Sequence, residues 1–335
     1  MPKKIFLNIF FLLPDFLFRL IGQFSKIVIR GHALDDQTNI FLKFIPIKTL
    51  KDSNEESIKS IRKSFEKSSG LINIAAKPTS KVSFKDIDIG NGLIIRKYSP
   101  SILKSTKSIL YFHGGGYIFG SINTHHNIVM YYASFLGVEI YSLDYSLSLE
   151  NKFPIALDDA CKAYDWMLDK NINSNEISLC GDSAGAHLAA SLTNKLLKDS
   201  KDLPGSQLLI YPMVSPSCDF KSFDDFGNGF YLTASNMKWM WKKFKNKNDD
   251  FENPCFDLLK TDINSNNFPK TLIVTAGFDV LCDEAEKYAY LLHQKSINIR
   301  QLHYPSLIHG FASMSRLRKA KLAVDHFLDE YEKIL

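Results

Sequence analysis

The sequence predicts an α/β fold in which helices cover both faces of one mostly parallel sheet. Short apolar runs that indicate buried strands alternate with helical patterns through the last two thirds of the chain. These runs lie at residues 109–112, 138–143, 177–180, 207–211, 271–276 and 298–304. Two earlier strands, 82–89 and 93–98, flank a Gly-Asn-Gly turn that is typical of a hairpin. We therefore expect a sheet of eight strands.

The composition is that of a globular chain. With 335 residues and 45% hydrophobic content, one large α/β domain with a smaller appendage can bury a sizeable core. The net charge of +5 is mildly basic, and no Lys/Arg stripe alternates with aromatic residues, so we expect no nucleic-acid partner. The five cysteines are scattered without C-x-x-C spacing, which predicts a reducing compartment and no metal site.

The most informative motif is G-D-S-A-G at residues 181–185. It lies between the apolar run 177–180 and a run of strong helix formers at 186–192. A G-x-S-x-G motif on such a strand-to-helix turn is a nucleophile elbow, which holds the serine hydroxyl out at the top of a parallel sheet. The glycines are needed because no side chain fits beside so tight a turn. Ser183 is therefore the candidate nucleophile.

A glycine run, H-G-G-G at residues 113–116, follows the strand expected at 109–112. Runs of this type form the oxyanion loop of lipases and esterases. Ester hydrolysis builds negative charge on the carbonyl oxygen, and backbone N–H groups that already point there stabilise it without reorganisation. We expect the donors to be the N–H groups of Gly114, Gly115 and Ala184.

A general base should come from one of the five histidines that follow Ser183. Four of them fall within helix or strand patterns: His187, His293, His303 and His326. Only His309 lies in a loop just past a strand, where a base can reach the serine hydroxyl. His309 is therefore the predicted base.

The acid that would orient this histidine is predicted to be Asp279. It leaves the carboxyl end of the buried strand 271–276, and a buried carboxylate there would hold the imidazole in the correct tautomer. The alternative role for Asp279 is a helix N-cap, but Asp283 and Glu284 suit the start of the following helix better. Asp283 stays as the reserve candidate for the acid.

Together these motifs resemble the hormone-sensitive-lipase-like branch of the α/β-hydrolases, which includes bacterial esterases and arylacetamide deacetylases. The resemblance covers roughly residue 75 to the end, and within this range it includes the segments 144–150 and 153–160. The sequence departs from the family pattern at Ser146, Leu149, Ala186, Val280 and Cys282. Because none of these positions carries a catalytic group, the departures bear on local packing and substrate fit.

The resemblance implies an α/β-hydrolase catalytic domain over residues 76–335, covered by a helical cap. The cap would be built from residues 1–75 and an insertion at about 213–250. A cap of this kind excludes water and lines an acyl pocket with apolar side chains. The expected lining residues are Tyr117, Phe119, Phe230 and Tyr231.

Residues 1–25 admit three interpretations: a cap helix, an amphipathic segment that rests on a membrane surface, or an uncleaved export signal. Asp15 and Arg19 interrupt the apolar run, and no small-residue cleavage site follows it. Pro14 predicts a division into two short helices. The sequence leaves these three interpretations open.

The sequence thus predicts a serine carboxylester hydrolase that cleaves short-to-medium acyl esters through an acyl-enzyme, with no cofactor and no metal. The alternatives are an amidase or deacetylase, a membrane-associated lipase on the same triad, and a non-catalytic small-molecule receptor. The expected partner is a small ester substrate. We expect a cytoplasmic protein, with membrane contact through residues 1–25 left open.

Overall fold

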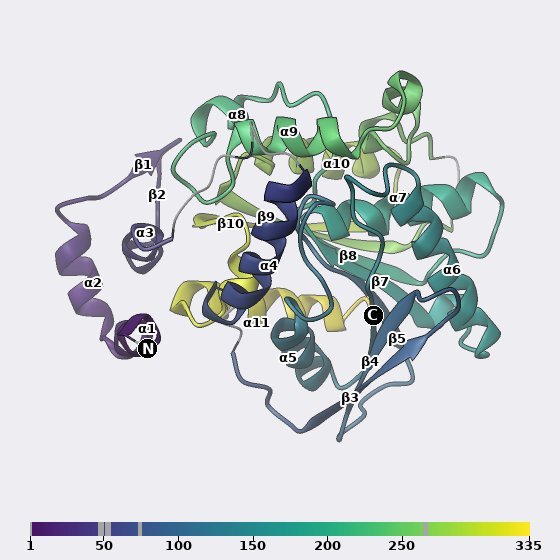
Figure 1. The fold of residues 1–335 in the computed structure, drawn as a ribbon, viewed down its shortest axis with the longest axis horizontal. Helices are drawn as coiled ribbons and strands as arrows, with labels where there is room; N and C mark the ends of the chain where they lie inside the picture. The colour runs from purple at the N-terminus through teal and green to yellow at the C-terminus, as the bar shows by residue number, and fades with distance from the viewer. Residues whose placement is uncertain (1, 46–49, 51–54, 73–75, 264–266) are drawn as a thin grey trace.

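The computed structural model describes residues 2–45, 50, 55–72, 76–263 and 267–335, and one large sheet organises most of them (Figure 1). The strands of this sheet are β3 (Val82–Asp88), β4 (Ile94–Pro100), β5 (Ser108–Phe112), β6 (Glu139–Leu143), β7 (Ile177–Asp182), β8 (Ser206–Ile210), β9 (Lys270–Phe278) and β10 (Ile299–Ile308). Their order in space is β10-β9-β8-β7-β5-β6-β4-β3. The prediction of eight strands is confirmed.

The sheet is parallel except at one edge. The hairpin β3–β4 is antiparallel, and β4 pairs antiparallel with β6, whereas every other neighbouring pair in the sheet is parallel. The central strands β5, β7 and β8 are buried along their whole length, which explains why their sequences are short continuous apolar runs. Parallel strands place their carboxyl ends at the same edge of the sheet, and loops at that edge carry the candidate catalytic residues.

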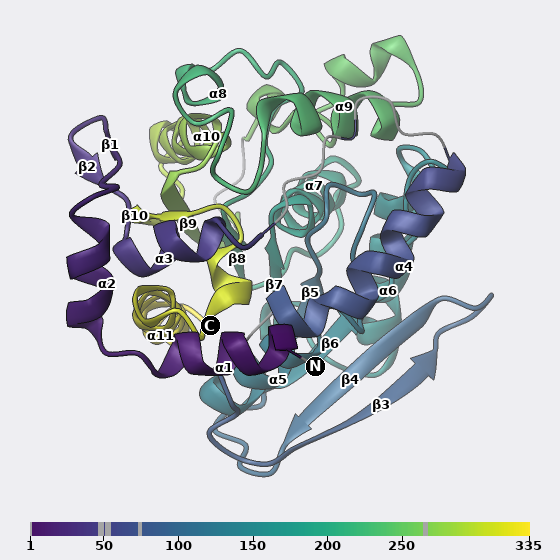
Figure 2. The same cartoon turned by 60° about the vertical axis from the view of Figure 1, so that its left-hand side comes forward.

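Helices cover both faces of the sheet (Figure 2). On one face α5 (His126–Leu136) packs on α11 (Arg318–Glu332), with the rings of Tyr132 and Phe327 6.0 Å apart. On the other face lie α6 (Ile155–Asp169), α7 (Ala184–Lys198) and α10 (Cys282–Gln294). Short 3₁₀ helices occur at Ser174–Glu176 (η1), Asn248–Glu252 (η2), Leu258–Lys260 (η3) and Phe311–Met314 (η4).

The segment between β8 and β9 carries α8 (Lys221–Asp225) and α9 (Ala234–Phe244), and α4 (Glu55–Ile72) contributes to the same region. Arg62 of α4 donates from Nε to the carbonyl oxygen of Ile118 at 2.7 Å and pairs with Glu150 at 2.8 Å. The N–H of Leu50 donates to the side chain of Asn236 on α9 at 3.0 Å. The contact of Leu50 connects the segment before β3 with the insertion after β8, and those of Arg62 connect it with the loops after β5 and β6.

The first two helices pack beside α3 and the start of α11. The helices α1 (Pro2–Leu12) and α2 (Asp15–Gly22) are separated at Pro14, as predicted, and are followed by a short hairpin, β1 (Val28–Ile29) and β2 (His32–Ala33), and by α3 (Asp36–Leu42). The ring of Phe10 packs on Phe18 and Phe41, and Arg318 at the start of α11 pairs with Asp15. The ring of Phe10 on α1 thus finds partners on α2 and α3, and the ion pair of Asp15 joins α2 to the start of α11. Of the described segments before β3, Leu50, α4 and the β1–β2 hairpin contact the cap insertion or the loop below it, the hairpin through Arg30, which pairs with Asp225 of α8 at 2.7 Å.

Candidate active site

The elbow places Ser183 between β7 and α7 in a left-handed backbone conformation, with φ 57° and ψ −118°. A hydrogen bond of 2.8 Å from its N–H to the carbonyl oxygen of Ile210 holds this strained turn against β8. A Cβ atom built on Gly181 would come within 2.3 Å of the Gly185 backbone, and one built on Gly185 within 2.0 Å of the Phe112 oxygen. Both glycines are therefore required by the close approach of the backbone.

Ser183, His309 and Asp279 form one hydrogen-bonded series. The Oγ of Ser183 lies 3.0 Å from Nε2 of His309, and Nδ1 of His309 lies 2.7 Å from Oδ2 of Asp279. The other oxygen of Asp279 accepts from the N–H of Leu281 at 2.9 Å, and the carboxylate is 1% exposed. The structure brings these three residues together because β7, β9 and β10 end at the same edge of the sheet.

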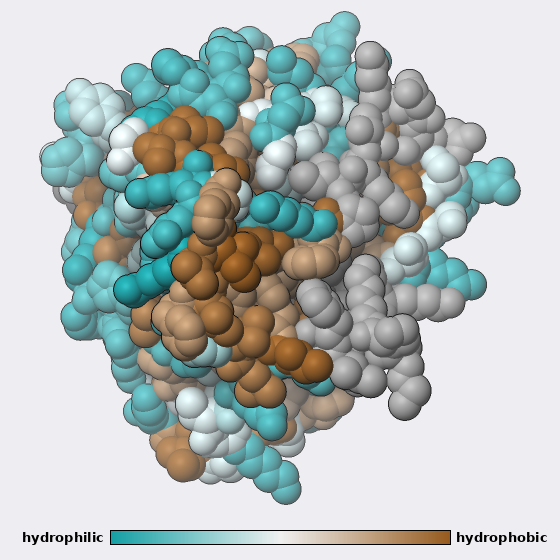
Figure 3. Space-filling model, turned by 90° about the vertical axis from the view of Figure 1, so that its left-hand side faces the viewer, coloured by the Kyte–Doolittle hydropathy of each residue, from teal (hydrophilic) through white to brown (hydrophobic). Residues whose placement is uncertain are grey.

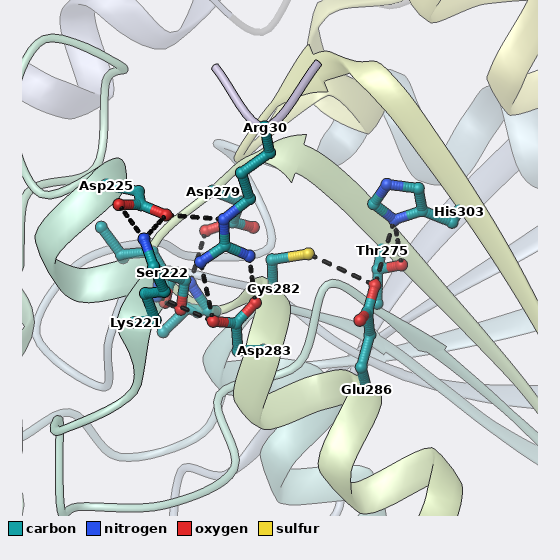
Figure 4. Close-up of polar contacts among 12 residues, drawn as sticks. Arg30, Lys221, Ser222, Asp225, Thr275, Asp279, Cys282, Asp283, Glu286 and His303 are labelled. Atoms are coloured by element: carbon teal, nitrogen blue, oxygen red, sulfur yellow. Dashed lines mark hydrogen bonds and ion pairs between the residues drawn. The ribbon is translucent and has the colours of Figure 1, made fainter. Parts of the chain in front are cut away.

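Asp283, the reserve candidate for the acid, has other partners (Figure 4). Its two oxygens accept from the guanidinium of Arg30 at 2.6 and 2.9 Å, and one also accepts from the N–H of Ser222 at 2.8 Å. Asp283 therefore connects α10 to α8 and to the β1–β2 hairpin. Asp279 alone of the two carboxylates bonds to His309.

The oxyanion loop differs from the prediction at Gly114. Its N–H donates to Oδ1 of Asp182 at 3.0 Å, so this donor is already used inside the protein. Within the described part of the chain, the N–H groups of Gly115, Gly116 and Ala184 have no hydrogen-bond acceptor. The prediction of Gly114 as an oxyanion donor is therefore corrected: Gly114 positions the loop, and Gly116 replaces it among the candidate donors.

Asp182 is the functional residue that the sequence analysis missed. Its buried Oδ1 accepts from Tyr111 Oη at 2.6 Å as well as from Gly114, and it lies 3.6 Å from Nε2 of His125. Burial raises the pKa of Asp182, but the neighbouring His125 and the hydrogen bond from Tyr111 lower this pKa by more, to below its ordinary value. An acidic residue next to the nucleophile, inside the elbow motif, was the signal that could have found it.

Steric contacts explain the other glycines of the loop. A Cβ atom on Gly115 would come within 2.1 Å of the Phe119 carbonyl oxygen, and one on Gly116 within 2.1 Å of Sδ of Met240. Both glycines have positive φ, 131° and 62°. Met240 belongs to α9, so the cap helix lies directly against the oxyanion loop.

Two of the predicted pocket residues hold the loop in place. Tyr117 is buried, its Oη lies 2.6 Å from Nδ1 of His187, and its ring stacks on Phe244 of α9 at 3.7 Å. The ring of Phe119 lies 6.0 Å from Phe65 of α4. The described contacts of Tyr117 therefore join the oxyanion loop to α7 and the cap, and its expected role as a pocket-lining residue stays a prediction.

The other two predicted pocket residues lie on the loop between α8 and α9. Phe230 is buried, with its ring 5.3 Å from Phe278 at the end of β9. Tyr231 lies closer to the catalytic base, since a Cβ atom built on Gly310 would be 3.2 Å from its ring. Tyr211, which the sequence analysis did not select, packs its ring 4.7 Å from that of His309. Tyr231 and Tyr211 are thus the aromatic residues placed at the catalytic histidine.

The buried histidines around the site are structural. His187 lies under the elbow helix, as predicted, and its Nε2 is 3.0 Å from the carbonyl oxygen of Phe256. Burial lowers the pKa of His187 to about 4 and that of His113 to about 3. Both rings are therefore neutral at physiological pH.

One group of three side chains in the described ranges has the composition of a metal site: Cys282, Glu286 and His303 (Figure 4). Their ligand atoms lie within 4.8 Å of one another. Hydrogen bonds already explain this arrangement, because Cys282 donates to Glu286 at 3.5 Å and His303 Nδ1 lies 3.0 Å from Thr275 Oγ1. We assign no metal to these residues.

Comparisons with known proteins agree with this geometry. Residues 109–313 match a family described by its α/β hydrolase fold. The chain is 30% identical over 268 residues to an ethyl acetate hydrolase of Pseudomonas putida, covering 76% of this chain and 83% of that protein. It is 30% identical over 242 residues to an arylesterase of Saccharolobus solfataricus, covering 70% and 77%. A solved hyperthermophilic esterase from Pyrobaculum calidifontis superposes with a TM-score of 0.79 at 29% identity, covering 90% of this chain and 98% of that one.

Proposed function

The chain belongs to the α/β hydrolase fold family and is an enzyme of the carboxylesterase type, and we propose that it cleaves small carboxylic esters with Ser183 as the nucleophile. The observation that carries this proposal is the hydrogen-bonded series from Ser183 through His309 to Asp279. Relatives named ethyl acetate hydrolase and arylesterase support the ester substrate.

In the acylation step, His309 Nε2 takes the proton from Ser183 Oγ as this oxygen attacks the ester carbonyl carbon. The contact of 3.0 Å between these atoms suits direct proton transfer. The carboxylate of Asp279 accepts a hydrogen bond from the Nδ1–H group of His309. This bond fixes the tautomer that leaves Nε2 free as the base, and the negative charge stabilises the imidazolium. When the tetrahedral intermediate collapses, the alcohol leaves with the proton from Nε2.

The negative charge of the tetrahedral intermediate would be held by the N–H groups of Gly115, Gly116 and Ala184. All three are held by the elbow and loop backbone and lack an internal acceptor among the described residues. Such preorganised donors need no rearrangement as the charge develops, and each contributes on the order of a hundredfold to a thousandfold in turnover. Gly114 contributes indirectly, because its bond to Asp182 fixes the start of the loop.

In the deacylation step, a water molecule gives a proton to His309 Nε2 and attacks the acyl carbonyl carbon. The tetrahedral intermediate then releases the carboxylic acid, and the Nε2 proton returns to Ser183 Oγ. The same three backbone donors would hold the oxyanion in this step. Neither step requires a cofactor.

We infer a preference for short-to-medium acyl chains from the position of the cap. Met240 lies directly against Gly116, and Tyr231 lies against Gly310 beside the catalytic histidine. The cap insertion thus reaches the site both at the oxyanion loop and at the base. Side chains so close to the reacting atoms limit the space for a long acyl chain.

The test compares the wild type with Ser183→Ala on para-nitrophenyl esters from acetate to palmitate. We expect the wild type to hydrolyse the shorter esters best and the variant to turn them over roughly a millionfold more slowly. Circular dichroism of both proteins controls for folding. If the folded wild type hydrolyses no ester, the matching para-nitroanilides decide between an amidase and a protein that only binds small molecules.

A further inference from the structure

The helices α1 and α2 carry large apolar side chains on two opposite sides. Leu7, Phe10 and Phe18 are buried, and Phe10 contacts both Phe18 and Phe41. The side chains that point away from the protein form what we call the outer apolar face, and they are Ile9, Leu12, Phe16, Leu20, Ile21 and Phe24. A helix on the surface of a protein needs only one apolar side to pack on that protein, so a second apolar side that is exposed indicates a partner outside the chain.

The exposure of this face is large. Leu12 and Phe24 are 80% and 88% exposed, and each of the other members is about half exposed or more. Figure 3, which turns this side of the molecule toward the viewer, shows hydrophobic side chains gathered together, with hydrophilic side chains crossing and flanking them. Isolated apolar residues on a protein surface are ordinary, whereas a cluster of this size is typical of an interaction site.

Exposed basic residues occur within and just after the segments that carry or adjoin the outer apolar face. Arg19 lies on α2 between Phe16 and Leu20 in the sequence, and Lys26 and Lys43 follow α2 and α3. All three are exposed and form no ion pair with a carboxylate in the described part of the chain. Two acidic residues lie nearby: Asp15 of α2, which is paired with Arg318, and Asp36 of α3, whose carboxylate lies beside Gly22. The face therefore combines apolar side chains with an excess of basic ones.

We propose that this face docks the protein on the surface of a bilayer that contains anionic lipid. Helices of this type lie in the plane of the interface, with their apolar side chains roughly 5–10 Å deep and their basic groups at the lipid phosphates. Within the described ranges no helix has the length and apolar content to cross a bilayer, so the contact is with one surface only.

A second copy of the chain fits this face less well than a lipid surface does. In a two-fold symmetric dimer the same face meets itself. Arg19, Lys26 and Lys43 would then approach the same residues of the partner subunit, and this repulsion would grow as water is excluded. A negatively charged bilayer surface accepts both the apolar and the basic side chains.

The first experiment measures co-sedimentation of the full chain with vesicles. Vesicles of phosphatidylglycerol mixed with phosphatidylcholine are compared with vesicles of phosphatidylcholine alone. We expect stronger binding to the anionic vesicles and weaker binding at about 0.5 M salt, because salt at that level screens the basic residues. Binding that is equal for both compositions and unaffected by salt would contradict the charge argument.

The second experiment uses two matched triple variants. L12S/F16S/F24S removes three members of the outer apolar face, whereas I102S/L103S/Y290S removes three residues that are also largely exposed but lie elsewhere. We expect the first variant to partition into anionic vesicles roughly a hundredfold less than the wild type and the second to match the wild type. Far-UV circular dichroism and the melting midpoint control for folding. Because the experiment measures vesicle binding, its result does not depend on the esterase proposal.

A third variant, R19Q/K26Q/K43Q, tests the charges alone. We expect it to lose roughly tenfold or more of its preference for anionic vesicles. The proposal is overturned if the wild type stays in the supernatant with anionic vesicles, or if L12S/F16S/F24S binds them as well as the wild type. It is equally overturned if the face instead supports a dimer, seen as a concentration-dependent mass that only L12S/F16S/F24S abolishes, without vesicle binding.

Discussion

The catalytic centre and the N-terminal helices use the same kinds of residue in opposite ways. At the end of β7, Ser183 and His309 are enclosed and each polar group has a defined partner. On α1 and α2, Phe10 is packed inside while Leu12, two positions along, is almost fully exposed. The side chains of Ser183 and His309 find their partners within the chain, whereas α1 and α2 find such partners on only one of their two apolar sides.

The difference teaches that the fold explains burial inside the chain, whereas a cluster of exposed large apolar side chains calls for a partner outside it. A backbone that approaches within van der Waals distance at Gly181 and Gly185 leaves the elbow a single arrangement. The outer apolar face has no such constraint from the chain. Substitutions in the two regions should therefore affect different measurements, catalysis and stability in the first and surface binding in the second.

The largest expected effect separates the two carboxylates near the catalytic base. Asp279→Asn should lower kcat on the order of ten thousandfold, because an amide would favour the wrong tautomer of His309. Asp283→Asn should lower kcat far less, since Asp283 bonds to Arg30 and Ser222. Steady-state kinetics on one short ester measures both, and equal losses would contradict the assignment of Asp279.

The next effect compares the two sides of α1. Phe10→Ala should lower the free energy of unfolding by about 3 kcal/mol, because it removes a buried ring that packs on Phe18 and Phe41. Leu12→Ala should change it by less than about 0.5 kcal/mol. Urea denaturation in the absence of lipid measures both values. A large loss for Leu12→Ala would mean that the chain itself covers the outer apolar face.

A smaller effect tests the positioning role of Asp182. Tyr111→Phe removes one hydrogen bond to Oδ1 of Asp182 and leaves the catalytic residues in place. We expect kcat to fall roughly tenfold, with KM nearly unchanged, because the loop that carries the oxyanion donors loses part of its support. The control is Tyr164→Phe, which removes a buried tyrosine hydroxyl that bonds to the Asp202 carbonyl oxygen instead. Equal kcat values for the two variants would contradict the positioning role of Asp182.

The smallest expected effect is on the pH dependence of stability. Glu284 is fully buried and accepts from the N–H of Val214 at 2.7 Å, and burial raises its pKa well above the ordinary value. Because the folded state holds this proton more tightly than the unfolded state, the contribution of Glu284 to stability is lost as the pH rises above about 4.5. Glu284→Gln stays neutral at every pH.

Glu284→Gln should therefore melt at roughly 2 °C above the wild type at pH 7, a difference that shrinks toward zero near pH 4. Thermal melts across this pH range measure the difference. A constant offset at every pH would indicate a change of packing and would contradict the titration of Glu284. Glu284 bonds to Val214, where the cap insertion leaves the sheet. The change in melting temperature would therefore report on the junction between the cap insertion and the sheet.

The sequence by itself determined the sheet and the three residues that we propose as the catalytic triad. The alternation of apolar runs with helical patterns predicted eight strands, and the order Ser183, Asp279, His309 predicted three residues that the structure brings together. These features are local: a glycine-bounded turn or a loop at a strand end is specified by a few adjacent residues. A local pattern can therefore be recognised without knowing what lies across the fold.

Only the tertiary structure decided the features that depend on a distant partner. The N–H of Gly114 could be excluded as an oxyanion donor only once Asp182, 68 residues along the chain, was seen to accept it. The aromatic residue Tyr117 could be assigned to the support of the loop only once Phe244 was seen against its ring. Likewise, α1 and α2 are apolar in sequence whether they cover the active site or face outward. Which side of a helix is covered depends on neighbours far away in sequence, and a periodic pattern does not name those neighbours.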